Sequence, residues 1–168
     1  NIYRDIYGFG GSYPLIEGNV SNSGEYIWQV PDHLNNSYQV RVAYADDERA
    51  YGDSGIFRII PEFIVISPAS GNMWPVGTFQ TIAWNCSSAN ESRVNITYFN
   101  ASQEESINSS ANNSYPADTT RYYPWGPVPD YVNKTAQFKI RVRGINTTAA
   151  ADSATIKIVG YFNLTEPN

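Results

Sequence analysis

The chain of 168 residues repeats itself at offsets between 94 and 100 residues. "YQVRVAY" at 38–44 resembles "FKIRVRG" at 138–144, and "SGIFRIIPEFIVISPAS" at 54–70 resembles "SATIKIVGYFNLTEPN" at 153–168. Two further pairs follow in the same order, "NIYRD" at 1–5 with "NITYF" at 95–99 and "EYIWQVPD" at 25–32 with "RYYPWGPVPD" at 121–130. Ordered self-similarity of this kind indicates a repeat architecture, in which each repeat is one structural unit.

The phase of the repeat predicts how the chain divides into domains. Residues 61–159 form one complete repeat, and residues 1–60 match only the later part of one. Residues 160–168 match a first strand, which belongs either to a following repeat or to a neighbouring subunit as a donor strand. Because an incomplete repeat exposes apolar surface, we expect either a longer tandem array or completion by a neighbouring subunit.

Period-two alternation of apolar and polar residues dominates the chain. It is clear in "QTIAWN", "VNITYF", "YQVRVAY" and "ATIKIV", which are separated by clusters of Gly, Pro, Asn and Ser. Such alternation predicts β-strands, and the clusters between them predict turns. About seven short strands per repeat predict an all-β chain of tandem immunoglobulin/fibronectin-III-like β-sandwich repeats of about 100 residues.

Turn and core residues of the complete repeat carry a family resemblance. They are Pro68, Gly71, Trp74, Gly77, Ile82 and Trp84, followed by a Trp-x-Val-Pro element at Trp28, Val30 and Pro31 and, with one extra residue, at Trp125, Val128 and Pro129. The chain resembles the Ig-like repeats of fungal and protist cell-surface proteins, including the Kre9/Knh1-like domain and Ser/Thr-rich GPI-anchored wall proteins. The resemblance implies an Ig-like fold and a cell-surface location, as in tandem-bead extracellular glycoprotein fibres.

The charge content excludes two classes of partner. Charged residues make up 16% of the chain, against about 25% in typical soluble domains, and the net charge is −5. No basic stripe is available to neutralise phosphates, so we expect no nucleic-acid partner. No apolar run approaches 18 residues, so we expect no membrane span.

The one cysteine, Cys86, either pairs outside the chain or is a buried free thiol, and strand parity favours the buried thiol.

Asn-x-Ser/Thr triplets occur eleven times, whereas composition alone would give roughly two or three. The acceptors are Asn19, Asn35, Asn85, Asn90, Asn95, Asn100, Asn108, Asn112, Asn133, Asn146 and Asn163. This density predicts an extracellular protein that carries covalent N-linked glycans and no cofactor. Sugar would supply the solubility that the few charges do not.

Strand parity is compatible with glycans at the densest run of acceptors. Trp84 and Val94 belong to the inward sets of their strands, which turns Asn85 and Asn95 outward. A hairpin between these strands would project Asn85 and Asn95 from one outer face, with Asn90 at the turn. The apolar pattern and the acceptors therefore do not compete for the same positions.

Catalytic and metal-binding chemistry has little support. The single histidine, His33, lies in a loop, and no motif supplies the positioned partner that a general base or nucleophile needs. Asp46, Asp47, Glu48 and Asp53 form a weak calcium candidate, but their spacing is not that of an EF-hand, and a solvated loop is favoured. We therefore expect neither an enzyme nor a metal site.

Clustered aromatic residues leave a second function open. Tyr122, Tyr123 and Trp125 could stack on sugar rings, although Trp28 and Trp125 recur at matching positions, as core anchors would. The sequence thus predicts a non-enzymatic structural glycoprotein that associates with itself head to tail in an extracellular fibre or cell-surface layer. The alternative is a carbohydrate-binding or glucan-assembly module, whose partners are extracellular glycans.

Overall fold

A computed structural model describes residues 2–6, 15–131 and 137–160 of the chain. Within these ranges every regular element is a β-strand, which confirms the prediction of an all-β protein. The described residues contain no helix long and apolar enough to cross a membrane. The chain divides into two compact units, Asn1–Ile60 and Pro61–Asn168.

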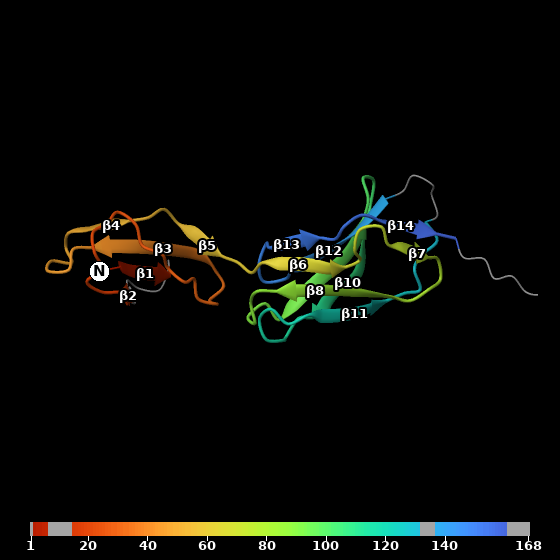
Figure 1. The fold of residues 1–168 in the computed structure, drawn as a ribbon, viewed down its shortest axis with the longest axis horizontal. Helices are drawn as coiled ribbons and strands as arrows, with labels where there is room; N and C mark the ends of the chain where they lie inside the picture. Colours follow the sequence, from red (N-terminus) through yellow and green to blue (C-terminus); the bar gives the residue numbers. More distant parts are fainter. Residues whose placement is uncertain (1, 7–14, 132–136, 161–168) are drawn as a thin grey trace, which may run out of the picture. The chain divides into compact units, whose positions relative to one another are not determined.

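The first unit contains a single antiparallel sheet among its described residues (Figure 1). Its strands are β1 (Ile2–Ile6), β2 (Leu15–Glu17), β3 (Asn35–Ala43), β4 (Tyr51–Asp53) and β5 (Phe57–Ile59). The order is β2-β1-β3-β4, and β5 also pairs with β3. The long strand β3 is therefore the centre of this unit.

The second unit contains two sheets. Its strands are β6 (Phe63–Ser67), β7 (Met73–Pro75), β8 (Gln80–Cys86), β9 (Arg93–Phe99), β10 (Glu104–Asn112), β11 (Arg121–Trp125), β12 (Gln137–Gly144), β13 (Ala150–Asp152) and β14 (Ile156–Val159). One sheet has the order β11-β8-β6, and the other has the order β10-β9-β12-β14-β7 with β13 also on β12. All pairs are antiparallel except β14 with β7.

Both sheets of the second unit contribute to one apolar core. Trp84 from β8, Ile96 from β9, and Ile140 and Val142 from β12 have no exposed surface and belong to one cluster of buried residues. Buried and partly exposed residues alternate along β9 and β12, as period-two patterning requires. The predicted inward residues therefore build this core.

The predicted hairpin between the strands of Asn85 and Asn95 is wrong. Strand β8 pairs with β6 and β11, whereas β9 pairs with β10 and β12, so the two strands lie in different sheets. Residues 87–92 connect one sheet to the other. Parity could not detect this crossing, because a strand buries the same alternate residues whether its neighbour in sequence lies beside it or across the core.

Strand register relates the two units residue by residue. Val42 of β3 pairs with Ile2 of β1 and Gly52 of β4. Val142 of β12 pairs with Ile96 of β9 and Ala151 of β13. The sheet of the first unit is thus the counterpart of β9, β12, β13 and β14, and its described residues form no counterpart of the β11-β8-β6 sheet.

Candidate functional site

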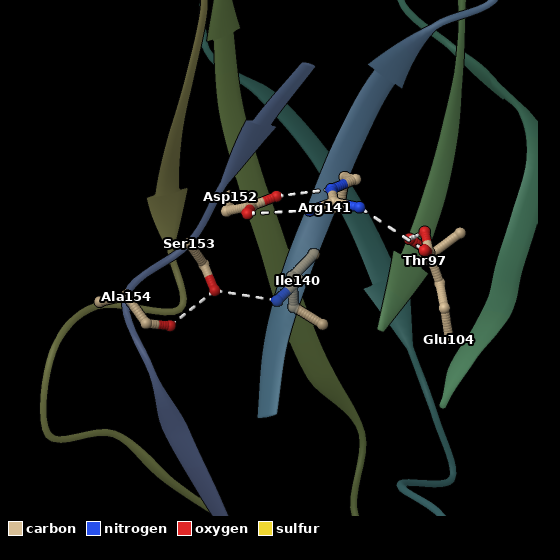
Figure 2. A network of polar contacts seen from close by, with 7 residues as sticks. All are labelled: Thr97, Glu104, Ile140, Arg141, Asp152, Ser153 and Ala154. Atoms are coloured by element: carbon tan, nitrogen blue, oxygen red, sulfur yellow. Dashed lines mark hydrogen bonds and ion pairs between the residues drawn. The ribbon is translucent and has the colours of Figure 1, made fainter. Parts of the chain in front are cut away.

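An arginine–aspartate pair occurs at the same place in both units. In the second unit, Nε and Nη2 of Arg141 donate to Oδ1 and Oδ2 of Asp152 at 2.7 and 3.1 Å, as Figure 2 shows. In the first unit, the same atoms of Arg41 donate to Asp53 at 2.7 and 2.8 Å. This bidentate pairing spans β12 and β13 in one unit and β3 and β4 in the other.

A serine completes the same arrangement in each unit. The Ser153 hydroxyl accepts from the Ile140 N–H at 2.9 Å and donates to the Ala154 carbonyl at 2.6 Å (Figure 2). The Ser54 hydroxyl accepts from the Val40 N–H at 2.9 Å and donates to its neighbour's carbonyl at 2.8 Å. We call the three residues in each unit the Arg–Asp–Ser clasp. In each clasp, the serine hydroxyl gives a backbone N–H of the central strand a hydrogen-bond partner at the point where one short strand ends and the next begins.

Further contacts make the outer face of the second unit's larger sheet ionic. The Arg141 guanidinium lies 4.3 Å from the Phe99 ring centroid and 3.5 Å from Glu104 Oε2. Glu104 Oε1 accepts from the Thr97 hydroxyl at 2.7 Å. The hydrogen bonds to Asp152 raise the pKa of Arg141. The face formed by β10, β9, β12 and β13 therefore presents paired charges.

The acidic loop proposed as a weak calcium candidate is occupied by arginine contacts. Asp53 pairs with Arg41, and Asp47 accepts from Arg49 Nε and Nη2 at 2.8 and 3.0 Å. These hydrogen bonds lower the pKa of both carboxyl groups. Asp46 and Glu48 are exposed. Across the part of the chain that the structure describes, no three His, Cys, Asp or Glu side chains group together as a metal site would require.

Eight of the eleven acceptor side chains lie in the described part of the chain, and none of the eight is fully buried. The exposed ones are Asn19, Asn90, Asn112 and Asn146, and the partly buried ones are Asn85, Asn95, Asn100 and Asn108. Asn35 lies in β3, and its side chain is outside the description, as are Asn133 and Asn163 altogether.

Three acceptors share one turn conformation. Oδ1 of Asn100, Asn108 and Asn112 accepts from the backbone N–H of the serine two residues on, at 2.8, 2.8 and 3.0 Å. This Asx turn fixes the carboxamide oxygen against the chain's own backbone. All three acceptors lie in or beside β10, which is an edge strand. The sequence identifies these residues but does not reveal their common geometry.

Two acceptors occupy central strands. Oδ1 of Asn85 on β8 and Oδ1 of Asn95 on β9 are buried without a hydrogen-bond partner. Nδ2 is the atom that carries an N-linked glycan, and each of the two residues as a whole is partly exposed. Each side chain therefore buries its oxygen but keeps part of its surface accessible.

Glu91 is a buried carboxylate that the sequence did not single out. Oε1 accepts from the backbone N–H and the Nδ2 of Asn146, each at 3.2 Å, and Oε2 accepts from the Thr147 hydroxyl at 2.9 Å. A side chain at Gly144 would place its Cβ 2.5 Å from Glu91 Oε2. Glu91 thus holds the β12–β13 loop, which contains the Asn146 acceptor, against the β8–β9 connection.

Asn113 and Arg121 complete this polar region beneath the loops. Oδ1 of Asn113 accepts from Trp84 Nε1 at 2.8 Å, and its Nδ2 donates to the backbone carbonyl of Glu91. The buried Arg121 guanidinium donates to the carbonyls of Thr119 and Tyr115 at 2.5 and 3.1 Å. Because both side chains contact backbone and core groups, we interpret their role as stabilising the fold.

The clustered aromatic residues do not share one face. Tyr122 is 69% exposed on the outer face of β11. Tyr123 and Trp125 lie at the alternate positions of β11 and point to its other face. The Tyr123 hydroxyl accepts a hydrogen bond from Asn108 Nδ2 at 3.2 Å. The Trp125 ring centroid lies 5.2 Å from that of Tyr98 and 5.6 Å from that of Trp74. Of the three residues, Tyr122 is exposed, whereas Tyr123 and Trp125 are partly buried against the core.

Two further reactive side chains, Cys86 and His33, lie in the described part of the chain. Cys86 is a free thiol with no exposed surface, as strand parity predicts, and its Sγ lies 3.4 Å from the Ser88 carbonyl oxygen. His33 is exposed in a loop. No protein-family model matches this chain, and neither does any curated protein.

Proposed function

We propose that the chain is a non-enzymatic structural glycoprotein of the extracellular space or cell surface. Its Ig-like β-sandwich repeats would carry N-linked glycans and associate head to tail with further copies in a fibre or surface layer. One observation carries the proposal: the first unit repeats the core sheet of the second but leaves its apolar face open.

The strand order of the second unit supports an Ig-like sandwich. The chain crosses several times between the β11-β8-β6 sheet and the β10-β9-β12-β14-β7 sheet, and inward residues of both sheets share one core. Immunoglobulin and fibronectin-III domains have this two-sheet organisation, with three or four strands in each sheet. The first unit then corresponds to one of the two layers.

The open face is apolar. Val42 is 54% exposed, whereas its counterpart Val142 is fully buried beneath the second sheet. Tyr44, at the end of the same strand, is 61% exposed. Tyr38 remains buried because its ring stacks on Phe57 at 6.0 Å and its hydroxyl donates to a loop carbonyl at 2.8 Å. Exposed apolar patches of this kind mark interaction surfaces.

The second unit indicates which partner fits such a face. The equivalent surface is covered by β6, β8 and β11, whose inward residues include Phe63, Ile82 and Trp84. A strand layer supplied by an adjacent repeat or by another copy has the shape and apolarity to cover Val42 in the same way. A contact between two different surfaces of identical chains propagates head to tail, as a fibre or layer requires.

Sedimentation velocity tests this interface on the secreted, glycosylated chain. We expect the wild-type protein to sediment as assemblies whose size grows with concentration, and Val42→Lys to sediment as single chains. Ile27→Lys is the matched control, because Ile27 is 93% exposed in a loop outside the sheet. Wild-type protein that remains a single chain at every concentration would contradict the proposal.

A carbohydrate-binding or glucan-assembly module is the second candidate, favoured by the exposed ring of Tyr122. Binding to a glycan array that is lost in Tyr122→Ala, with the fold unchanged, would support this candidate over the structural one. If neither the wild type nor Tyr122→Ala binds the glycan array, the structural glycoprotein is favoured.

A further inference from the structure

The outer face of the β11-β8-β6 sheet is apolar, unlike the ionic outer face of the other sheet. Ile64 and Ile66 on β6 and Tyr122 on β11 are large exposed hydrophobic residues. Between them on β8 lies Ala83, which points outward yet is only 4% exposed. Tyr122 of β11 pairs directly with Ala83 on one side, and Ser67 of β6 pairs with it on the other. We call Ile64, Ala83 and Tyr122 the outer platform.

A glycan acceptor lies within the same face. Asn85 follows Ala83 by two residues on the central strand β8, and Ile64 is its direct partner on β6. Tyr122 is its diagonal neighbour on β11, and diagonal neighbours in a sheet are about 7–8 Å apart. Because Asn85 is partly exposed on the central strand of this sheet, an attached sugar starts at the centre of the platform.

We propose that the outer platform binds the first sugars of the glycan attached to its own Asn85, an inference that rests on the proposed N-glycosylation. N-acetylglucosamine presents an apolar C–H face that suits an aromatic ring flanked by aliphatic side chains. The Tyr122 ring and Ile64 receive this face, and the polar edge of the sugar faces water. The glycan thereby covers apolar surface that the strands leave exposed.

The position of Asn85 also decides between occupants. A sugar on the central strand lies between this sheet and any protein surface that approaches it. The platform is therefore separate from the open face of the first unit, where a second copy is expected. On this sheet the glycan takes the place of a protein partner.

Asn95 provides a matched control within the same unit. It also lies on a central strand with a buried Oδ1, but its direct partner on β12 is Arg143, and Thr97 and Arg141 of the same outer face belong to the ionic network. The two acceptors thus share a buried Oδ1 on a central strand, but the surface around Asn85 is apolar and the surface around Asn95 is ionic. A glycan on Asn95 has no apolar platform to lie on.

The test uses secreted full-length chains that retain one acceptor, Asn85 or Asn95, trimmed enzymatically to a single N-acetylglucosamine. We expect NMR signals of the Asn85-linked sugar to shift upfield through the ring current of Tyr122, and the shift to vanish in Tyr122→Leu. Signals of the Asn95-linked sugar should show neither effect. The Asn85-linked sugar should also raise the urea midpoint of unfolding, and Tyr122→Leu should reduce that gain.

Each other outcome overturns the inference in a distinguishable way. An occupied Asn85 whose sugar signals match those of Asn95 shows that the platform does not bind the sugar. Tyr122 signals that change with protein concentration in the glycosylated chain show that a second copy occupies the face. Intact-glycopeptide mass spectrometry separates the two proposals: an empty Asn85 beside occupied acceptors contradicts only this inference, whereas the absence of sugar at every acceptor contradicts the proposed function as well.

Discussion

Arg141 and Asp152 are joined by two hydrogen bonds of 2.7 and 3.1 Å, and the same two bonds join Arg41 and Asp53 about 100 residues earlier. In both units the residue after the aspartate is a serine that bonds back to the central strand. The repeat is therefore preserved in side-chain geometry and not only in strand order. It is preserved in a unit whose apolar face is covered and in one whose face is open.

Removing the serine hydroxyl of the Arg–Asp–Ser clasp should lower the unfolding free energy more in the second unit, whose core is closed, than in the first. Ser153→Ala leaves the buried N–H of Ile140 without its partner, which costs about 1–3 kcal/mol of unfolding free energy. Ser54→Ala is the matched control, because Ser54 is exposed and water can replace its hydroxyl. Urea unfolding of both variants checks the difference, and equal losses would contradict this reading of the clasp.

Gly144→Ala should destabilise the second unit. The new Cβ would lie 2.5 Å from Glu91 Oε2 and from Thr147 Oγ1, and Glu91 is fully buried and held by three donors, so it has no room to move. Overpacking of this kind typically costs about 1–3 kcal/mol. Gly52→Ala, which meets nothing within 4 Å, should unfold like the wild type. An unchanged urea midpoint in Gly144→Ala would show that the loop is not held as described.

In protein made without glycans, Trp125→Ala should lower the stability of the fold, whereas Tyr122→Ala should leave it nearly unchanged. Trp125→Ala removes a partly buried ring that packs on Trp74 and Tyr98, so it should cost more than Tyr122→Ala but less than the roughly 3–5 kcal/mol lost with a fully buried aromatic residue. Tyr122→Ala changes an exposed side chain and should stay within about 0.5 kcal/mol of wild type. Thermal unfolding followed by circular dichroism checks both variants. A larger loss in Tyr122→Ala would contradict the assignment of Trp125 to the core.

The Tyr98–Glu105–Tyr131 contact should make stability depend on pH on the acid side. Hydrogen bonds from Tyr98 at 2.6 Å and Tyr131 at 2.8 Å lower the pKa of Glu105. The folded-state pKa is therefore below the unfolded one, so this contribution is present above the unfolded pKa and is lost as the pH falls through the folded value. The stability difference between wild type and Glu105→Gln should shrink from about pH 7 towards about pH 3. A difference that is constant with pH would contradict the shifted pKa.

Local patterning accounts for what could be predicted from the sequence. Alternation identified the inward residues Trp84 and Val94 and the outward positions of Asn85 and Asn95, because burial on one side of a strand imposes a period of two. The partners of β8 and β9 could not be predicted, since the choice between a hairpin and a crossing depends on what packs across the core.

Side-chain networks were the least predictable part. Asp53 was read as part of an acidic loop, although Arg41 and Asp53 recur as Arg141 and Asp152 in the aligned repeats, a signal that could have indicated the ion pair. Glu91 had no such signal: its burial depends on a loop 55 residues further along the chain. Long-range contacts of this kind leave no periodic trace in the sequence.

Electron microscopy of the secreted, glycosylated chain tests the proposed assembly most directly. Association through the open face of the first unit predicts filaments or layers in which copies repeat head to tail, with sugar density on their outer surfaces. Dispersed particles the size of one 168-residue chain, with no larger assembly at any concentration, would contradict it.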